Sequence, residues 1–478
     1  MARSQEPERH ACMMAPFLEL AVLMLDVTAS HERDRHRIFF LVLHLLPLGE
    51  GKSHPSKREK TERPIQSHQA NRSRPHQRIE SQGVPPHMKI TDIKVWPTRV
   101  AENRSWIFVE VNTDEGVTGF GEATNSGGGG VIMVARMVEL VRETVQGADF
   151  AEGLIGQNAN EIERIWQNLY RRFTTLGPRG LVTSVISGID MALWDIKGKT
   201  LGVPIYELLG GKVRDSIQLY THVRNQDDPT MAAAHARELV DMGHTALKTD
   251  PFVEMRIRHR RYLDGRISAA GAQHGIDVMT AIREEVGPEI DLMVDAHGNF
   301  NVPTAIDLCN RMKDVSLNWF EEPVQPESIN ALRQVKNGTD TPLCVGERLY
   351  TRYDFADVLS EGLTNYIMPD ICWTGGISEM RKIASLAETY YVPISPHDAL
   401  GTLNVVGGAQ VMMATPNFYR LETGPDTADI YNKVLKEPIE FIGDQFTLPD
   451  KPGLGVELDT EYLAAHPDPH WAQAGGGG

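Results

Sequence analysis

From residue 217 to residue 423, short apolar runs alternate with stretches in which apolar residues recur at helical spacing. Buried parallel strands read as continuous apolar runs, whereas helices repeat apolar residues at i, i+3, i+4 and i+7. Regular alternation of the two predicts βα units and a parallel sheet. Eight units of about 26 residues fit the low end of a (β/α)₈ barrel. The runs are 217–223, 246–249, 291–295, 317–320, 342–346, 366–368, 392–395 and 418–421.

A different pattern precedes these units. Strand-like stretches at 89–99, 106–111 and 117–122 include a hairpin signal at Asp114-Glu115-Gly116. Helical periodicity follows at 131–145, 158–172 and 184–201. The glycine-rich stretch 125–130 is predicted to be a loop, either a mobile lid or a plain linker, and 173–180 is a second loop. We expect an α+β capping domain at 88–214, a barrel at 215–425, and a C-terminal segment at 426–478 in which 441–459 returns to the cap.

The two ends read differently. Residues 49–87 are rich in Lys, Arg, Ser, His, Gln and Pro, which is typical of disorder. An apolar patch after Arg3 and Arg9 resembles a secretory signal, but Glu6 and Glu8 and the lack of a convincing cleavage site argue against one. We expect residues 1–87 to be upstream translation or a non-native leader, with Met88 as the natural start, and 475–478 to be a disordered tail.

Composition narrows the functions. The 478-residue chain carries a formal net charge of −16, although residues 1–87 are slightly basic. So acidic a chain is not expected to bind nucleic acid or an anionic membrane, and no stretch is long enough to span a bilayer. Four cysteines without a CxxC pair predict buried thiols in the cytoplasm rather than a disulfide framework.

Three acids follow three successive apolar runs. Asp295, Glu321 and Glu347 are separated by 26 residues each, which is one βα unit. Neighbouring strands are about 4.8 Å apart, so these carboxylates are expected to converge on one ion. An all-oxygen site of this kind suits Mg²⁺. The alternative is that each acid merely caps the following helix, which three acids in register make less attractive.

Two histidines lie near the same edge. Asp370 ends the sixth run and His397 the seventh, so a carboxylate is expected to fix the histidine's tautomer and raise its basicity. His297 lies two residues past Asp295, and along a strand both side chains point the same way. The alternatives are a helix-capping aspartate and packed structural histidines.

Further polar residues end other runs. Lys248 could pair with a substrate carboxylate, and Asp250 could bind a hydroxyl or restrain a base; the alternative is a surface ion pair. The unit after Asp250 is about 21 residues longer than the others, and its insert could close over an anionic substrate or form a solvated helical face. Glu422, if protonated, could hydrogen-bond a developing oxyanion. The insert carries Arg256, Arg258, His259, Arg260 and Arg261.

Several motifs together resemble the enolase superfamily, in its mandelate racemase/muconate lactonizing enzyme-like branch. They are Gly119-Phe-Gly-Glu-Ala123, Ser187-Gly-Ile-Asp-Met-Ala-Leu-Trp-Asp-Ile-Lys-Gly-Lys199, Phe320-Glu-Glu-Pro, Gly346-Glu-Arg, Pro369-Asp370 with Gly375-Gly376, and Pro452-Gly-Leu-Gly-Val. Within that branch the chain resembles galactonate and gluconate dehydratases. The resemblance implies a (β/α)₇β TIM-type barrel with an α+β capping domain formed by the N-terminal region and the C-terminal tail.

The resemblance also implies residue roles. Asp295, Glu321 and Glu347 would bind Mg²⁺, His397 with Asp370 would form a dyad, and His297 would face them. Lys248 and Glu422 would stabilise charge, and Arg348 would bind substrate. Where racemases carry Lys-x-Lys, the second lysine is Asp250 here, which puts racemization in doubt.

The implied reaction is Mg²⁺-dependent dehydration of an aldonic or aldaric acid to a 2-keto-3-deoxy acid, in a homo-oligomer. We expect neutral His297 to abstract the C2 proton and His397 to protonate the leaving hydroxyl, although the two roles could be exchanged. The alternatives are a racemase, epimerase or cycloisomerase on the same site, and a catalytically silent sugar-acid-binding protein.

Overall fold

The computed structural model describes residues 87–125, 128–143, 153–256, 264–424 and 427–473. The predictions for residues 1–86, for the arginine-rich insert at 258–261 and for the tail at 475–478 fall outside these ranges. Within the described chain, no helix combines the length and apolarity that a membrane span requires.

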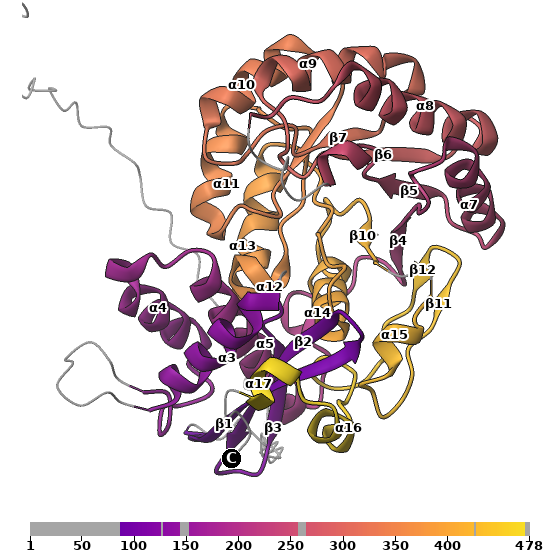
Figure 1. The fold of residues 1–478 in the computed structure, drawn as a ribbon. Coiled ribbons are helices and arrows are strands. Elements are labelled where there is room, and N and C mark those ends of the chain that lie inside the picture. The colour runs from indigo at the N-terminus through magenta and orange to yellow at the C-terminus, as the bar shows by residue number, and fades with distance from the viewer. Residues whose placement is uncertain (1–86, 126–127, 144–152, 257–263, 425–426, 474–478) are drawn as a thin grey trace, which may run out of the picture. The chain divides into compact units, whose positions relative to one another are not determined.

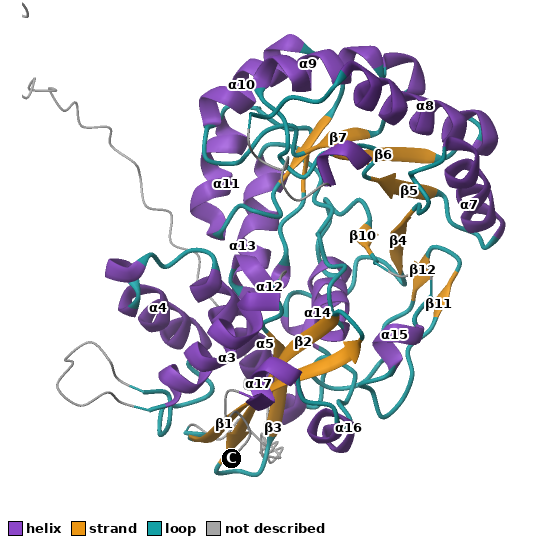
Figure 2. Cartoon of the chain, viewed as in Figure 1, coloured by secondary structure: helices purple, strands orange, loops and turns teal. Residues whose placement is uncertain are grey.

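The first described part is a three-stranded antiparallel sheet, in the order β1-β2-β3, covered by helices (Figures 1 and 2). The predicted strands and helices are confirmed with small shifts. One difference is that α3 begins at Gly128, inside the predicted loop 125–130. The elements are β1 Ile90–Ala101, β2 Arg104–Thr113, β3 Thr118–Glu122, α3 Gly128–Arg142, α4 Ile162–Arg172, η1 Thr174–Leu176, α5 Leu181–Leu201 and α6 Ile205–Leu208.

Helix α5 lies unusually close to strand β3, and glycines make this approach possible. A Cβ at Gly121 would sit 2.0 Å from the carbonyl oxygen of Gly188, and one at Gly119 would sit 2.2 Å from that of Ala192. Such distances are far inside van der Waals contact, so only glycine fits. Gly119 and Gly121 therefore allow β3 to pack directly against α5, and this packing positions Glu122, the next residue in the chain.

The second part is an α/β domain whose parallel strands follow one another in chain order. The sheet order β4-β5-β6-β7-β8-β9 confirms the predicted succession of βα units, and Figure 1 shows α7 to α11 outside the strands. The strands are β4 Ile217–His222, β5 Ala246–Thr249, β6 Asp291–Asp295, β7 Trp319–Glu321, β8 Leu343–Val345, β9 Tyr366–Ile367 and β10 Leu421–Glu422. The helices are α7 Pro229–Asp241, η2 Val253–Arg256, α8 Ala269–Val286, α9 Val302–Arg311, η3 Lys313–Val315, α10 Ile329–Gly338, α11 Thr351–Ser360, α12 Ile371–Thr374, α13 Gly376–Thr389 and α14 Thr402–Met413.

The seventh and eighth predicted strands are shorter than expected. Run 392–395 contributes only Ile394, which forms single parallel bridges to Ile367 and Phe418. Strand β10, a few residues beyond Phe418, pairs in parallel with β4. Prolines explain the short pairing, because Pro393 and Pro396 enclose only Ile394 and Ser395 and lack the N–H that a ladder needs.

The C-terminal segment contacts both parts of the structure: 441–459 reaches the cap, as expected, and also joins the second sheet. Its hairpin, β11 Phe441–Ile442 and β12 Gln445–Phe446, joins the second sheet through β4. The backbone N–H of Leu454 then donates to Asp195 of α5, and that of Arg99 in β1 donates to the carbonyl of His466. Short helices complete it: α15 Asp429–Asn432, α16 Thr460–Ala465 and α17 Pro469–Gln473.

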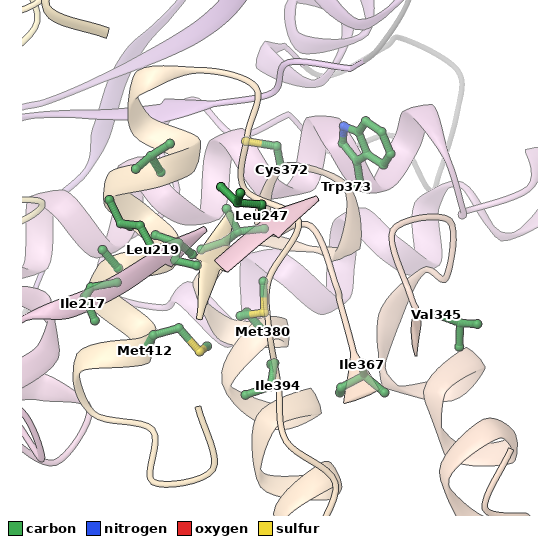
Figure 3. Close-up of a cluster of buried hydrophobic side chains, with 14 of the residues drawn as sticks. Ile217, Leu219, Leu247, Val345, Ile367, Cys372, Trp373, Met380, Ile394 and Met412 are labelled. Carbon is green, nitrogen blue, oxygen red and sulfur yellow. The ribbon is translucent and has the colours of Figure 1, made fainter. Parts of the chain in front are cut away.

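Alternation along β4 to β8 separates two groups of buried side chains. Apolar residues such as Leu219, Leu247 and Phe320 belong to the large core shared with the helices, part of which Figure 3 shows with Met380 of α13 and Met412 of α14. The intervening positions form a second, smaller cluster: Tyr220, Ala246, Met293, Trp319, Cys344 and Met368. The second set alternates with the first and leads, at the ends of the strands, to the predicted acids.

Candidate active site

The three predicted acids lie at the carboxyl ends of adjacent parallel strands. Asp295 ends β6 and is the register partner of Glu321, which ends β7. Glu347 follows β8 after Gly346. All three are buried, with exposed fractions of 4%, 0% and 4%. The strand register that the 26-residue spacing predicts is confirmed for Asp295 and Glu321.

Lys248 is buried among these acids. Its Nζ lies 2.9 and 3.0 Å from the two carboxylate oxygens of Glu321, 2.8 Å from Glu422 Oε1 and 3.7 Å from Asp295 Oδ2. Burial disfavours the ammonium, but Glu321, Glu422 and Asp295 outweigh it and raise the pKa of Lys248 well above its usual value. The surface ion pair considered for Lys248 and Asp250 is therefore excluded: this lysine is a buried cation of the acid cluster.

The acid cluster carries more carboxyl groups than Lys248 can neutralise. Burial, followed by repulsion from Asp295, raises the pKa of Glu321 well above its usual value. In contrast, the pKa of Asp295 is lowered to about 2, because His297 and Lys248 overcome the cost of burial. Glu321 is thus the member of the cluster that most readily takes a proton in the absence of further positive charge.

Glu422 lies beside a hydroxyl, an imidazole and an ammonium group. It accepts a hydrogen bond from the Tyr220 hydroxyl at 2.8 Å, and its other oxygen lies 2.6 Å from His222 Nε2 and 2.8 Å from Lys248. Although burial opposes ionisation, Lys248 and His397 hold its pKa well below the usual value. These surroundings favour the carboxylate of Glu422 over the protonated acid on which its predicted oxyanion role depends.

His297 lies on one side of the acid trio, by which we mean Asp295, Glu321 and Glu347. Chain register alone does not bring it there, since β6 ends at Asp295 and His297 has a left-handed backbone with φ of 49°. Its Nε2 lies 3.2 Å from Asp295 and its Nδ1 lies 3.1 Å from Asp250. Burial lowers the pKa, but the two aspartates prevail and raise the pKa of His297 to about 9. Asp250 thus restrains an imidazole, one of the two roles predicted for it, and His297 is protonated rather than neutral at pH 7.

His397 reaches the trio from the other side. Its Nδ1 lies 2.9 Å from Asp370 Oδ2 and its Nε2 lies 3.1 Å from Glu347 Oε2, so the predicted pairing with Asp370 is present. Burial opposes protonation, but Glu347, Glu422 and Asp370 raise the pKa of His397 well above its usual value. Burial also raises the pKa of Asp370, to about 6, so it is ionised at neutral pH.

Arg348 contacts protein groups. Its Nη1 lies 2.6 Å from Glu322 and donates to the carbonyl of His297 at 2.8 Å, and its Nη2 lies 2.8 Å from Glu347. Arg348 therefore links Glu347, a candidate metal ligand, to the backbone carbonyl of His297. Substrate binding by Arg348 stays a prediction.

Some site residues were not predicted from the sequence. The Trp319 indole donates to Glu321 Oε2 at 3.1 Å, and Tyr220 donates to Glu422. Trp319 lies two residues before Glu321 on one strand, so alternation could have identified it. Glu322, whose pKa burial and Glu347 raise to about 8, gave no such signal because it follows the strand with φ of 38°.

As the side chains stand, no group of three or more His, Cys, Asp or Glu in the described chain is arranged to hold a metal ion. Asp295, Glu321 and Glu347 remain the candidates, because all three are buried carboxylates beside cationic groups. Lys248 contacts Asp295 and Glu321, and Arg348 and His397 contact Glu347. His297 and Glu322, which follow Asp295 and Glu321 closely in the chain, have left-handed backbones, and such strained backbone often accompanies functional sites.

Comparisons with known proteins cover most of the chain. Residues 80–210 match the mandelate racemase/muconate lactonizing enzyme N-terminal domain, and 231–462 match the enolase C-terminal domain-like family. A D-xylonate dehydratase from Haloferax volcanii is 33% identical over 79% of this chain and 89% of its own. A D-galactarolactone cycloisomerase from Agrobacterium fabrum is 34% identical over 77% and 93%, and a D-galactonate dehydratase from Variovorax paradoxus is 35% identical over 80% and 96%. A crystal structure of an enolase superfamily member from Salmonella Typhimurium matches with a TM-score of 0.72 and 31% identity, over 80% of this chain and 98% of that one.

Proposed function

Because the chain belongs to the enolase superfamily, in its mandelate racemase and muconate lactonizing enzyme branch, we propose that it is a hydro-lyase that dehydrates an aldonic or aldaric acid. The observation that carries this proposal is the pair of imidazoles on either side of one acid trio. His297 contacts Asp295 at one end, and His397 contacts Glu347 at the other. Relatives of similar identity dehydrate xylonate and galactonate, as their names state.

We propose that Asp295, Glu321 and Glu347 bind Mg²⁺, and the donor set fits such an ion. Each donor is a buried carboxylate oxygen, which a hard cation prefers. The raised pKa of Glu321, caused by burial and by Asp295, marks a cluster that needs added positive charge. When bound, Mg²⁺ supplies charge that stabilises an enediolate and, beside Asp295, disfavours the proton on His297.

The chain's own groups divide the proton transfers. In the proposed reaction His297 takes the proton from C2, which forms an enediolate of the substrate carboxylate. His397 then gives a proton to the hydroxyl on C3, so that the C3–O bond breaks and water leaves. The resulting enol tautomerises to the 2-keto-3-deoxy acid. Lys248, charged and buried, supports the anionic intermediate, and each proton transfer contributes about 10²–10⁴-fold.

The proposal extends to the closure of the barrel and to the domain limits. We propose that the bridges at Ile394, together with the pairing of β10 with β4, close the parallel strands into a (β/α)₇β barrel. We retain the predicted limits of the cap at 88–214, the barrel at 215–425 and the C-terminal segment at 426–478. The small acid sugar as partner, the homo-oligomeric state and the cytoplasmic location stay predictions.

One comparison favours a second function. The relative named D-galactarolactone cycloisomerase is as similar to the chain as the dehydratases are. A cycloisomerase, racemase or epimerase would need proton transfer at C2 without loss of water. Asp250 argues against a lysine base on that side, because its carboxylate lies against His297 Nδ1.

A screen of acid sugars with Mg²⁺ tests the proposal, and we expect a 2-keto-3-deoxy product from at least one aldonate or aldarate. Strand β6 offers a matched pair of variants, since Asp295 ends it and Asp291 begins it. Asp295→Asn should abolish both Mg²⁺ binding by calorimetry and turnover, whereas Asp291→Asn should retain both. Exchange of the C2 proton without product would favour the second function. Thermal stabilisation by an acid sugar without any reaction would instead indicate a binding protein.

A further inference from the structure

Behind the His397–Asp370 pair lies a buried asparagine, Asn404, in the first turn of α14. Its side chain is fully buried, and its Nδ2 lies 3.2 Å from Asp370 Oδ1 and 3.2 Å from Asp398 Oδ1. Its Oδ1 accepts a hydrogen bond from the Leu400 N–H at 2.9 Å. Because an amide oxygen accepts and an amide nitrogen donates, this contact fixes which end of Asn404 faces the two acids.

Asp398 is a second acid at this point. It is fully buried, and its Oδ1 also accepts from the Ile371 N–H at 3.0 Å. Its Oδ2 has no hydrogen-bond partner among the described residues and packs against Gly408, where a Cβ would lie 1.8 Å away. An ionised carboxylate buried with one bare oxygen is very costly. Burial and Asp370 accordingly raise the pKa of Asp398 well above its usual value.

The capping domain holds the helix that carries Asn404. Glu122, at the end of β3, accepts hydrogen bonds from the N–H groups of Leu403 at 2.8 Å and Asn404 at 3.0 Å through one oxygen. Its other oxygen accepts from the Thr124 hydroxyl. Unpaired N–H groups at a helix start favour such an acceptor. The cap therefore fixes the turn from which the Asn404 amide reaches Asp370.

We propose that Asn404 is a positioning residue that holds Asp370 Oδ1, with Asp398 beside it, so that Asp370 Oδ2 is left for His397. Asp370 otherwise has one further contact on Oδ1, from the Cys372 N–H at 2.7 Å. The Asn404 amide is thus the side-chain donor that fixes the rotation of this carboxylate. This inference rests on the proposed function for its catalytic consequence, but its structural part does not.

The test is Asn404→Asp, which keeps the shape but removes the amide donor. Loss of a partner that orients a site residue typically costs about 10–100-fold in activity. We expect kcat to fall by this factor, with KM and the Mg²⁺ dissociation constant, measured by calorimetry, unchanged. Asn417→Asp is the matched control, since Asn417 donates its Nδ2 to the carbonyls of Ala384 and Val392; it should lower the melting temperature and leave kcat unchanged.

Asp398→Asn and the double variant guard against a folding defect. Asp398→Asn replaces the carboxyl group by an amide of equal shape and leaves the Asn404–Asp370 contact in place, so it should retain kcat. The Asp398→Asn/Asn404→Asp double variant keeps the number of buried acids, so it should fold, yet kcat should stay low because Asp370 still lacks its donor. Recovery of kcat in the double variant would overturn the proposal, as would unchanged kcat in Asn404→Asp or an equal loss in Asn417→Asp.

A spectroscopic readout separates this inference from the proposed function. The proton between His397 Nδ1 and Asp370 should give a low-field ¹H NMR resonance that His397→Asn removes. We expect it in the wild type and in Asp398→Asn, and we expect its loss in Asn404→Asp. If no acid sugar reacts, the proposed function fails, but this resonance still decides whether Asn404 orients Asp370; a resonance retained in Asn404→Asp refutes that role.

Discussion

The two imidazoles of the site are held in very different ways. His297 is 32% exposed, follows a strand end with a left-handed backbone, and is held by two side-chain carboxylates, Asp295 and Asp250. His397 is 13% exposed, and its partner Asp370 is itself fixed from behind by buried groups of α12 and α14. His297 can therefore adjust to a substrate, whereas His397 is a preorganised part of the core.

This difference suggests why the two histidines suit different tasks. A base that approaches C2 gains from access to the substrate, and the pKa of about 9 of His297 depends on aspartates that a cation would compete for. An acid that protonates a leaving hydroxyl gains from a fixed orientation and from a proton held firmly by buried carboxylates. The structure therefore favours the assignment of His297 as base and His397 as acid.

The largest effect should come from removing either imidazole. His297→Asn and His397→Asn should each lower kcat by about 10²–10⁴-fold, which is the range of a general acid or base. In deuterated water, His397→Asn should still exchange the C2 proton, whereas His297→Asn should not. The reverse result would exchange the two roles, and full activity in either variant would remove that residue from the mechanism.

Replacing the carboxylates that hold the two imidazoles should lower kcat less than removing the imidazoles, and the two losses should differ. Asp370→Asn leaves His397 without the acceptor that fixes its tautomer, so kcat should fall by at least about 10²-fold. Asp250→Asn should cost only about tenfold, because Asp295 also contacts His297. Steady-state kinetics of the two variants compare the supports of the two histidines directly. Equal losses of kcat would show that His297 and His397 are held equally firmly.

The indole below the acid trio gives a third test. Trp319→Phe removes the hydrogen bond to Glu321 and keeps the aromatic packing. Partners of metal ligands typically contribute 10–100-fold to affinity, so we expect Mg²⁺ to bind about tenfold more weakly by calorimetry. Trp194→Phe, whose indole donates to Ser378 instead, is the matched control. Unchanged affinity in Trp319→Phe would show that Glu321 needs no such support.

The smallest effect concerns the pH dependence of folding stability through Glu122, which holds the start of α14. Burial raises the pKa of Glu122 from 4.5 to about 7, so the folded chain holds this proton more tightly than the unfolded chain does. Its contribution to stability is therefore present below pH 4.5 and is lost as the pH rises to about 7, by at most about 3 kcal/mol. Glu122→Gln should show a smaller fall in melting temperature over this pH window.

A control for this effect lies elsewhere in the cap. Burial also raises the pKa of Asp190 to about 7, but this acid accepts hydrogen bonds from Ser378 of α13 and not, as Glu122 does, from the first turn of α14. Asp190→Asn should flatten the same pH dependence while leaving kcat unchanged. An unaltered pH profile in Glu122→Gln would show that Glu122 is ionised in the folded chain.

Much of the fold could be predicted because periodicity is a local property. The runs that became β4 to β9 were visible as apolar stretches, and the spacing of Asp295 and Glu321 gave their register. The last two strands were overestimated, since Pro393 and Pro396 permit only one bridging residue. The tail was only partly predicted, because short strands such as β12 acquire their partner from across the sheet.

The sequence by itself determined which groups of the chain could do chemistry and at which strand ends they lie, because both follow from residue type and interval. Only the tertiary structure decided their charge states and supports. Lys248 and His397 hold the pKa of Glu422 below its usual value, and Asp295 together with Asp250, which comes from another unit, raises the pKa of His297 to about 9. Asn404 reaches Asp370 only after the cap has fixed α14. Such properties depend on burial and on distances between remote segments, and neither quantity is contained in local spacing.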